Sequence, residues 1–275
     1  MGIIKYFSLS IFLLGGCTSN FNNVSAFSKN TKMVTETTKS IIINNIESCE
    51  KIFYRFSSLK TIYNLNFDQK SCEERKINSE KIYTLNSTLN NFSEALTSLV
   101  NGDFVLVSFD PIKNSLDKSN LTAKEKNAVL NIGALITQIS LRTKRQNGLN
   151  KAFSDKNQDN IFILIKGLRE SAKFYRAGFS LDRQKIKILS ETFVQRSQEK
   201  EPLAVNLMLQ HLKEDEINIE LQIEIIDKYL ICLDEMEKSF KAAARSINNP
   251  KNEDIVKEIE YFSEKVYELN KIIRS

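Results

Sequence analysis

Apolar residues recur every three or four positions through most of this chain, and this spacing constrains the fold more than any other feature of the sequence. Such a period places apolar side chains on one face of an α-helix. Few residues interrupt it, because the chain of 275 residues contains only three prolines and eight glycines. We therefore expect an all-α protein, an elongated bundle of about six to seven helices.

The helical pattern is clearest in the second half of the chain. Apolar positions from Ile161 to Phe193 predict a helix of about 36 residues, and a longer helix should run from Pro202 to about Ile247. The second of these has a wide apolar arc, which is typical of a central helix with several neighbours. A final helix has apolar residues at regular four-three spacing and should pack antiparallel against a long helix. Its apolar positions are Ile255, Ile259, Phe262, Val266, Leu269 and Ile273.

Shorter helices are predicted in the first half of the chain. The first of them includes residues 42–56, and the second should begin at a Ser79 cap. Thr122 and Glu125 have the spacing of a capping box, which indicates the start of another helix. We expect that helix to end near Gly148, because glycine is favoured just beyond helix ends.

The N-terminus has the pattern of an export signal. One lysine, Lys5, precedes a short and mostly apolar run, and two glycines follow the run. A charged start, a short apolar stretch and a small-residue cleavage site together make a secretory signal. The apolar part, about eleven residues, is much shorter than the roughly 20 residues that a membrane-spanning helix needs. We expect residues 1–16 to be a signal peptide.

The tetrad Leu14-Gly15-Gly16-Cys17 resembles the lipobox of bacterial lipoproteins. The resemblance implies cleavage before Cys17, a diacylglyceryl group on its thiol and an acyl chain on the new amino group, with no other cofactor. Two or three chains hold a protein on its membrane. Thr18 stands where an aspartate would favour the inner membrane of Gram-negative relatives, so we expect an outer-membrane anchor facing the periplasm. The alternatives are an ordinary signal peptide and an N-terminal core helix with an incidental cysteine.

Two further segments follow the signal peptide. Residues 17–32 are rich in serine, asparagine and threonine and show little apolar periodicity, which predicts a flexible, lipidated tether. Residues 33–275 should form a single helical domain. An alternative is that this domain has two lobes, 40–150 and 151–275.

Three cysteines remain in the expected exported body. In an oxidising compartment, Cys49, Cys72 and Cys232 allow three pairings, each with one leftover thiol. We favour Cys49 with Cys72, whose bond would close a 24-residue loop and stabilise the fold by about 3 kcal/mol. Cys232 lies in an apolar run, so we expect a free, buried and inert thiol.

No residue is assigned as catalytic and none as a metal ligand. His211 is the only histidine, whereas zinc sites usually combine several histidines or cysteines. The acids Glu214–Glu216 lack the glycine turn of a calcium loop and should form a solvated helix face. Arg142, Lys144 and Arg145 should lie at a helix end, where cations complement the helix dipole. Contact between these cations and anionic lipid or an acidic partner is the alternative.

Composition narrows the range of functions. The net charge is +5, and charges of both signs make up 27% of the residues, so the surface should be mixed and not a nucleic-acid site. We expect a non-enzymatic interaction or scaffold protein of the cell envelope, bound to membrane lipid through Cys17 and to a protein partner. The alternatives are an immunity protein that neutralises an envelope-acting toxin, and a cleft-type ligand binder or an enzyme acting on cell-wall or lipid substrates.

Overall fold

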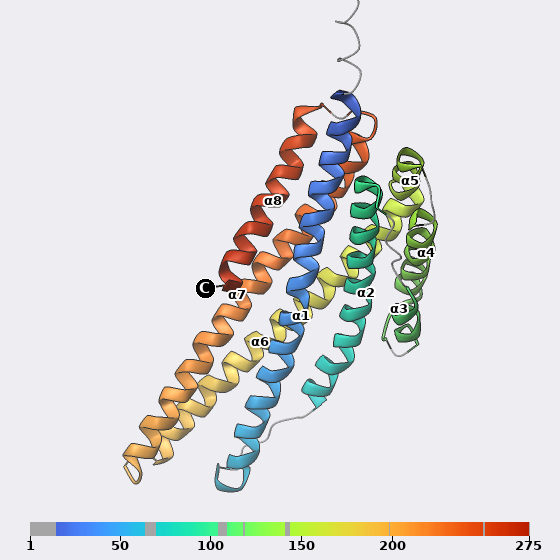
Figure 1. The fold of residues 1–275 in the computed structure, drawn as a ribbon. Coiled ribbons are helices and arrows are strands. Elements are labelled where there is room, and N and C mark those ends of the chain that lie inside the picture. The colour runs from blue at the N-terminus through green and yellow to red at the C-terminus, as the bar shows by residue number, and fades with distance from the viewer. Residues whose placement is uncertain are drawn as a thin grey trace, which may run out of the picture.

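The structure is a computed structural model, and it describes residues 15–63, 70–103, 109–117, 119–140, 144–197, 199–249 and 251–274. Within these residues every regular element is a helix, and there are eight of them. The all-α prediction is confirmed, with one helix more than the upper predicted number. Figure 1 shows the long helices side by side in an elongated bundle, with α3, α4 and α5 gathered on one flank.

Five long helices form the bundle, and three shorter ones cover part of it. The long helices are α1 (Gly15–Tyr63), α2 (Lys70–Asn101), α6 (Asp155–Ser197), α7 (Pro202–Ser246) and α8 (Glu253–Arg274). The short helices are α3 (Asp110–Ser115), α4 (Ala123–Ser140) and α5 (Arg145–Ala152). As its wide apolar arc predicts, α7 is central, because it packs against α1, α6 and α8. Helix α8 lies antiparallel beside α7 (Figure 1).

The segment after the lipobox-like tetrad differs from the prediction of a flexible tether, which is wrong. Residues 17–32 belong to α1, a single helix of 49 residues. Val24 and Phe27 are buried in the core, and the buried Ser28 hydroxyl donates a hydrogen bond to the backbone oxygen of Ser93 in α2 (3.2 Å). The polar composition is that of a linker, but here small polar side chains pack between helices.

Two predicted helix boundaries are also corrected, and one is confirmed. Helix α2 begins well before Ser79, which lies inside it. The helix expected to end near Gly148 stops earlier, and Gly148 is part of the separate helix α5. The capping box is present: the Thr122 backbone nitrogen donates to Glu125 Oε2 (2.8 Å), and the Glu125 nitrogen donates to Thr122 Oγ1 (3.3 Å).

One hydrophobic cluster extends from Val24 to Leu269 and draws on both of the lobes considered above, which favours the single domain. At its wider end the fully buried ring of Phe240 in α7 contacts four other aromatic rings. The centroid distances are 5.4 Å to Phe27, 6.1 Å to Phe92, 4.9 Å to Phe153 and 5.9 Å to Phe162. These lie in the range of favourable ring pairs. Phe240 therefore joins α1, α2, α6 and α7 at one point.

Helices α6 and α7 are also aligned by a regular series of ion pairs on their outer face, which we call the charge ladder. Three arginines of α6, seven residues apart, pair with three acids of α7 that have the same separation. The pairs are Arg169–Asp234 (2.7 Å), Arg176–Asp227 (2.6 Å) and Arg183–Glu220 (2.6 Å). Each exposed pair contributes only about 0–1 kcal/mol. Their shared spacing specifies one antiparallel register, as charged flanking positions do in coiled coils.

Candidate functional site

The predicted anchor lies at one end of the bundle. Leu14 is outside the described residues, and Gly15, Gly16 and Cys17 form the first turn of α1. In Figure 1 the start of α1 and the start of α7 lie at opposite ends of the molecule. An anchor at Cys17 would therefore leave the connection between α6 and α7 far from the membrane.

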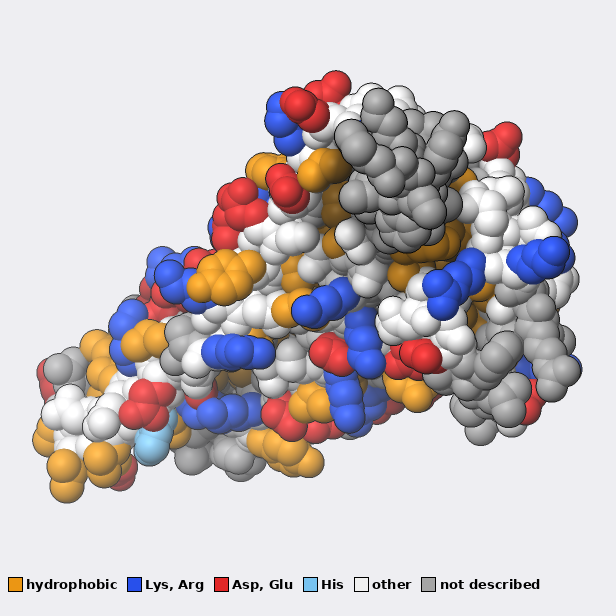
Figure 2. All heavy atoms as spheres, turned by 45° about the horizontal axis from the view of Figure 1, so that its top comes forward, with side chains coloured by type: hydrophobic (Ala, Val, Ile, Leu, Met, Phe, Trp, Pro, Cys, Tyr) orange, Lys and Arg blue, Asp and Glu red, His pale blue; other side chains and the backbone are white. Residues whose placement is uncertain are grey.

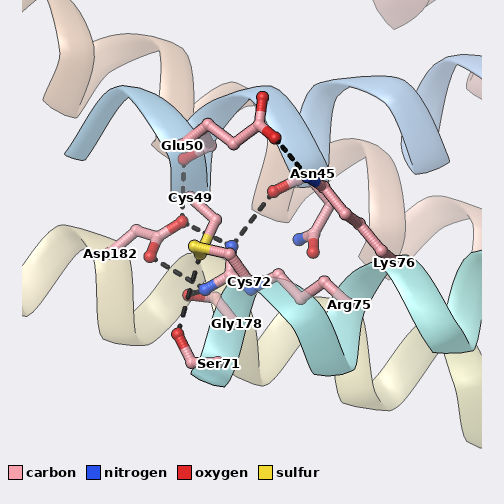
Figure 3. Close-up of a disulfide and its surroundings, with 10 residues drawn as sticks. Asn45, Cys49, Glu50, Ser71, Cys72, Arg75, Lys76, Gly178 and Asp182 are labelled. Atoms are coloured by element: carbon pink, nitrogen blue, oxygen red, sulfur yellow. Dashed lines mark hydrogen bonds and ion pairs between the residues drawn. A yellow bond between two sulfur atoms is a disulfide. The ribbon is translucent and has the colours of Figure 1, made fainter. Parts of the chain in front are cut away.

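A disulfide joins α1 to α2 where both helices meet α6 (Figure 3). It links Cys49 to Cys72, the pair favoured from the sequence, with their Cα atoms 5.7 Å apart. Cys232 is free and buried, and burial raises the pKa of its thiol to about 12. Because the thiolate is the reactive form, this cysteine is chemically inert at neutral pH.

Directly beside the disulfide lies a buried polar cluster, which we define as Asn45, Ser48, Arg75, Tyr175 and Asp182. The Arg75 guanidinium, 2% exposed, forms a two-pronged ion pair with the fully buried Asp182 carboxylate, through Nη1 to Oδ2 (2.7 Å) and Nη2 to Oδ1 (2.8 Å). This fork-to-fork geometry is the strongest that an arginine and a carboxylate form. The cluster ties α2 to α6 in the centre of the protein.

The remaining donors of Arg75 bind backbone oxygens. Nη1 donates to the Asn45 oxygen of α1 (3.1 Å), and Nη2 donates to the Gly178 oxygen of α6 (2.9 Å). A Cβ atom at Gly178 would lie 3.0 Å from the guanidinium carbon, so glycine permits this close approach. The arginine therefore holds three helices together, as Figure 3 shows.

Ser48 and Tyr175 complete the cluster. The Ser48 hydroxyl of α1 donates to Asp182 Oδ2 (2.8 Å). Burial raises the pKa of the Tyr175 phenol, whose hydroxyl donates to the backbone oxygen of Arg75 (3.2 Å). The Asn45 amide nitrogen donates to the backbone oxygen of Tyr175 (3.0 Å). The Asp182 carboxylate therefore accepts two hydrogen bonds from Arg75 and one from Ser48, an arrangement that favours a structural role.

A cavity of about 290 Å³ opens between α1 and α7, next to this cluster, and we call it the α1–α7 cavity. Its floor is apolar, formed by the buried side chains of Ile52, Phe179 and Ile219. Ser48 contributes to its wall, so the cavity and the buried polar cluster share a residue. The α1–α7 cavity is therefore backed by the buried polar cluster.

Two bridges close the ends of the cavity. At one end Asn44 of α1 donates to Gln222 of α7 (3.0 Å), and at the other Lys51 pairs with Asp215 (2.5 Å). Asp215 also pairs with Arg55 (2.6 Å) and is almost fully buried. The prediction of a solvated acidic face is wrong for Asp215, because this residue lies on the side of α7 that meets α1.

The other sequence candidates lie at the surface. His211 is exposed and lies 3.4 Å from Glu214 of the same helix turn. Arg142 is outside the described residues, and Lys144 is exposed. Arg145 begins helix α5 instead of ending the preceding helix, and its guanidinium donates to the backbone oxygen of Asn101, the last residue of α2 (3.0 Å). There it complements the dipole of α2 and not that of its own helix.

Arg75 and Asp182 were not identified from the sequence, and Asp215 was assigned to a solvated face, because charges are rarely buried. A signal was nevertheless present: each occupies a core position of its helical stripe. Asp182 lies between Phe179 and Ile186 with three- and four-residue steps, and Asp215 lies in the same way between Leu212 and Ile219. A charge at such a position indicates a buried ionic contact.

Comparisons of the chain with protein-family models, with curated proteins and with solved structures found no match. Among the described residues there is no group of three or more histidine, cysteine or acidic side chains that could hold a metal ion. No described helix combines the length and the apolar character needed to cross a bilayer. A function must therefore be proposed from the residues of this chain.

Proposed function

We propose that the protein is a lipid-anchored, non-enzymatic interaction protein of the cell envelope. Cys17 would hold it to a membrane, and its helical body would contact a protein partner. The observation that carries the proposal is the lipobox-like tetrad Leu14–Cys17 in the sequence, of which Gly15, Gly16 and Cys17 begin α1 at one end of an elongated bundle. Helix α1, with 49 residues, spans roughly 70 Å at 1.5 Å per residue. The far end of the body would stand about that distance from the lipid.

The packing of α1 indicates how the body would be oriented on the membrane. Phe21 is partly buried, and Val24, seven residues after Cys17, is fully buried in the core. Cleavage before Cys17 would leave less than two helical turns between the lipid and the packed body. A body joined so closely to its anchor keeps a defined orientation on the membrane, unlike one on a long flexible linker.

The surface is consistent with protein contact. On the face in Figure 2 basic and acidic side chains are interspersed, and apolar side chains gather at the narrow end. The first turns of α7, at the end of the bundle far from Cys17, expose Leu203 and Leu207, which are 74% and 54% exposed. An exposed apolar patch rimmed by polar side chains is typical of a surface that contacts another protein or a membrane.

Replacing Cys17 with serine tests the anchor. The variant should fold normally but lose incorporation of labelled fatty acid and leave the membrane fraction, because serine offers no thiol for the lipid. Replacing the neighbouring Thr18 with alanine is the matched control and should change neither property. Retention of the lipid label by the Cys17→Ser protein would show that the tetrad is not a lipidation site.

Site-specific photo-cross-linking in intact cells tests the partner. Cross-linkers placed at Leu203 and at Leu207 should trap one and the same protein, identified by mass spectrometry, and a cross-linker in that protein should recover this chain in return. Tyr267, an exposed residue of α8, provides a comparison position. If every position yields only lipid adducts, the protein does not act through a protein partner.

A further inference from the structure

We propose that the α1–α7 cavity binds a single free amino acid with an apolar side chain, recognised in its zwitterionic form. This inference does not depend on the proposed envelope function, since it concerns a small-molecule site in the body of the protein. It rests on the shape of the cavity, on the charges at its mouth and on the rigidity of its walls.

The cavity is a gap in an otherwise bridged contact between two antiparallel helices. The Asn44–Gln222 hydrogen bond and the Lys51–Asp215 ion pair are separated by seven residues on each helix, roughly 10 Å at 1.5 Å per residue. Between them stands Ser48, whose short side chain turns inward to Asp182 instead of reaching α7. The resulting volume of about 290 Å³ is just below the range for drug-sized ligand sites, about 300–1,000 Å³, as a smaller ligand requires.

Opposite charges at the cavity match the two ends of an amino acid. Glu47 and Lys51 lie one turn apart on α1, and both contribute to the cavity lining. Among the described residues the exposed Glu47 carboxylate has no hydrogen-bond or ion-pair partner, so it is available to a ligand ammonium group. The Lys51 side chain is 56% exposed, so its ammonium can reach a ligand carboxylate at the mouth.

A second cation, Arg55, allows Lys51 to leave Asp215 and pair with a ligand carboxylate. When Lys51 turns to a ligand, Asp215 keeps its ion pair with Arg55 (2.6 Å). A buried carboxylate without a partner would carry a large desolvation penalty. Arg55 reduces that penalty, so Lys51 can pair with a ligand carboxylate while Asp215 still faces a cation.

The floor selects the side chain of the ligand. Ile52, Phe179 and Ile219 offer only apolar surface, which suits a leucine-like side chain and disfavours a charged one. The small volume matches one amino-acid residue. The wall on α1 is held by the Ser48–Asp182 hydrogen bond and by the adjacent disulfide at Cys49, so little ordering is needed on binding.

Isothermal titration calorimetry of the full-length protein with L-leucine tests the proposal. Leucine should bind, and leucine methyl ester, N-acetyl-leucine and L-aspartate should each bind at least about tenfold more weakly. The dipeptide Leu-Leu distinguishes a free amino acid from a peptide end, and it should also bind more weakly because its two charges are further apart. Each charged contact contributes a factor of roughly ten to a hundred in affinity.

Two pairs of variants separate recognition from folding. Lys51→Gln and Glu47→Gln should each weaken leucine binding by roughly ten- to a hundredfold. Lys39→Gln and Glu36→Gln, on the same helix but lining a separate groove between α1 and α2, should leave it unchanged. The proposal is overturned if no amino acid binds up to about 10 mM. It is equally overturned if the blocked forms or the dipeptide bind as well as leucine, or if Lys51→Gln and Glu47→Gln have no effect.

Discussion

Replacing Arg75 with methionine should lower the free energy of unfolding by about 3–5 kcal/mol, because it leaves the Asp182 carboxylate buried without its partner. The carboxylate is fully buried, so water cannot take the place of the guanidinium. The same change removes donors from the backbone oxygens of Asn45 and Gly178. Urea unfolding of the purified protein measures the loss.

Two further variants show whether the loss comes from the unpaired charge. Arg183→Met removes an arginine of the charge ladder that is half exposed, and it should reduce stability by less than about 1 kcal/mol. The double variant Arg75→Met/Asp182→Leu should recover most of the stability lost in the single variant, because buried ion pairs can often be replaced by apolar side chains. Equal losses for Arg75→Met and Arg183→Met would contradict the role assigned to the buried polar cluster.

Replacing Phe240 with alanine should lower the free energy of unfolding by about 3–5 kcal/mol. Its ring is fully buried and contacts four other rings from three other helices and the end of α5, so the cavity left behind cannot close by moving one neighbour. Urea unfolding again gives the measurement, with helical content followed by circular dichroism.

Phe174 supplies the matched control for this variant. It lies on α6 and is 40% exposed. Phe174→Ala removes the same atoms from a surface position and should change stability by about 0.5 kcal/mol or less. If the two alanine variants lose the same stability, Phe240 is not the centre of the aromatic core.

The helical fold could be predicted because its signal is local. Apolar spacing along α6, α7 and α8 places the buried faces without knowledge of their neighbours, and the start of α7 at Pro202 is where the sequence indicates it. The first turns of α1 resemble a tether in sequence because only a few apolar residues, such as Val24 and Phe27, stand among polar ones, and because the polar residues make distant contacts. Ser28, for example, bonds a residue 65 positions away.

Long separation along the sequence also explains why the residues of the candidate site could not be paired from the sequence alone. Arg75 and Asp182 are 107 residues apart, and Lys51 and Asp215 are 164 apart. Each charge can be recognised as misplaced on its own helix, but its partner depends on how the helices pack. The disulfide is easier to predict, because three cysteines allow few pairings and the favoured pairing closes a short loop.

The charge ladder has a consequence for how this protein can vary in length. Inserting one residue in α6 turns every later side chain by about 100° and moves each later arginine away from its acid. Seven residues added to both α6 and α7 would restore the pairs and keep the apolar faces together. Helix α1, which packs beside both, would need to grow equally. Homologues with a longer or shorter body should therefore differ by matched steps of seven residues.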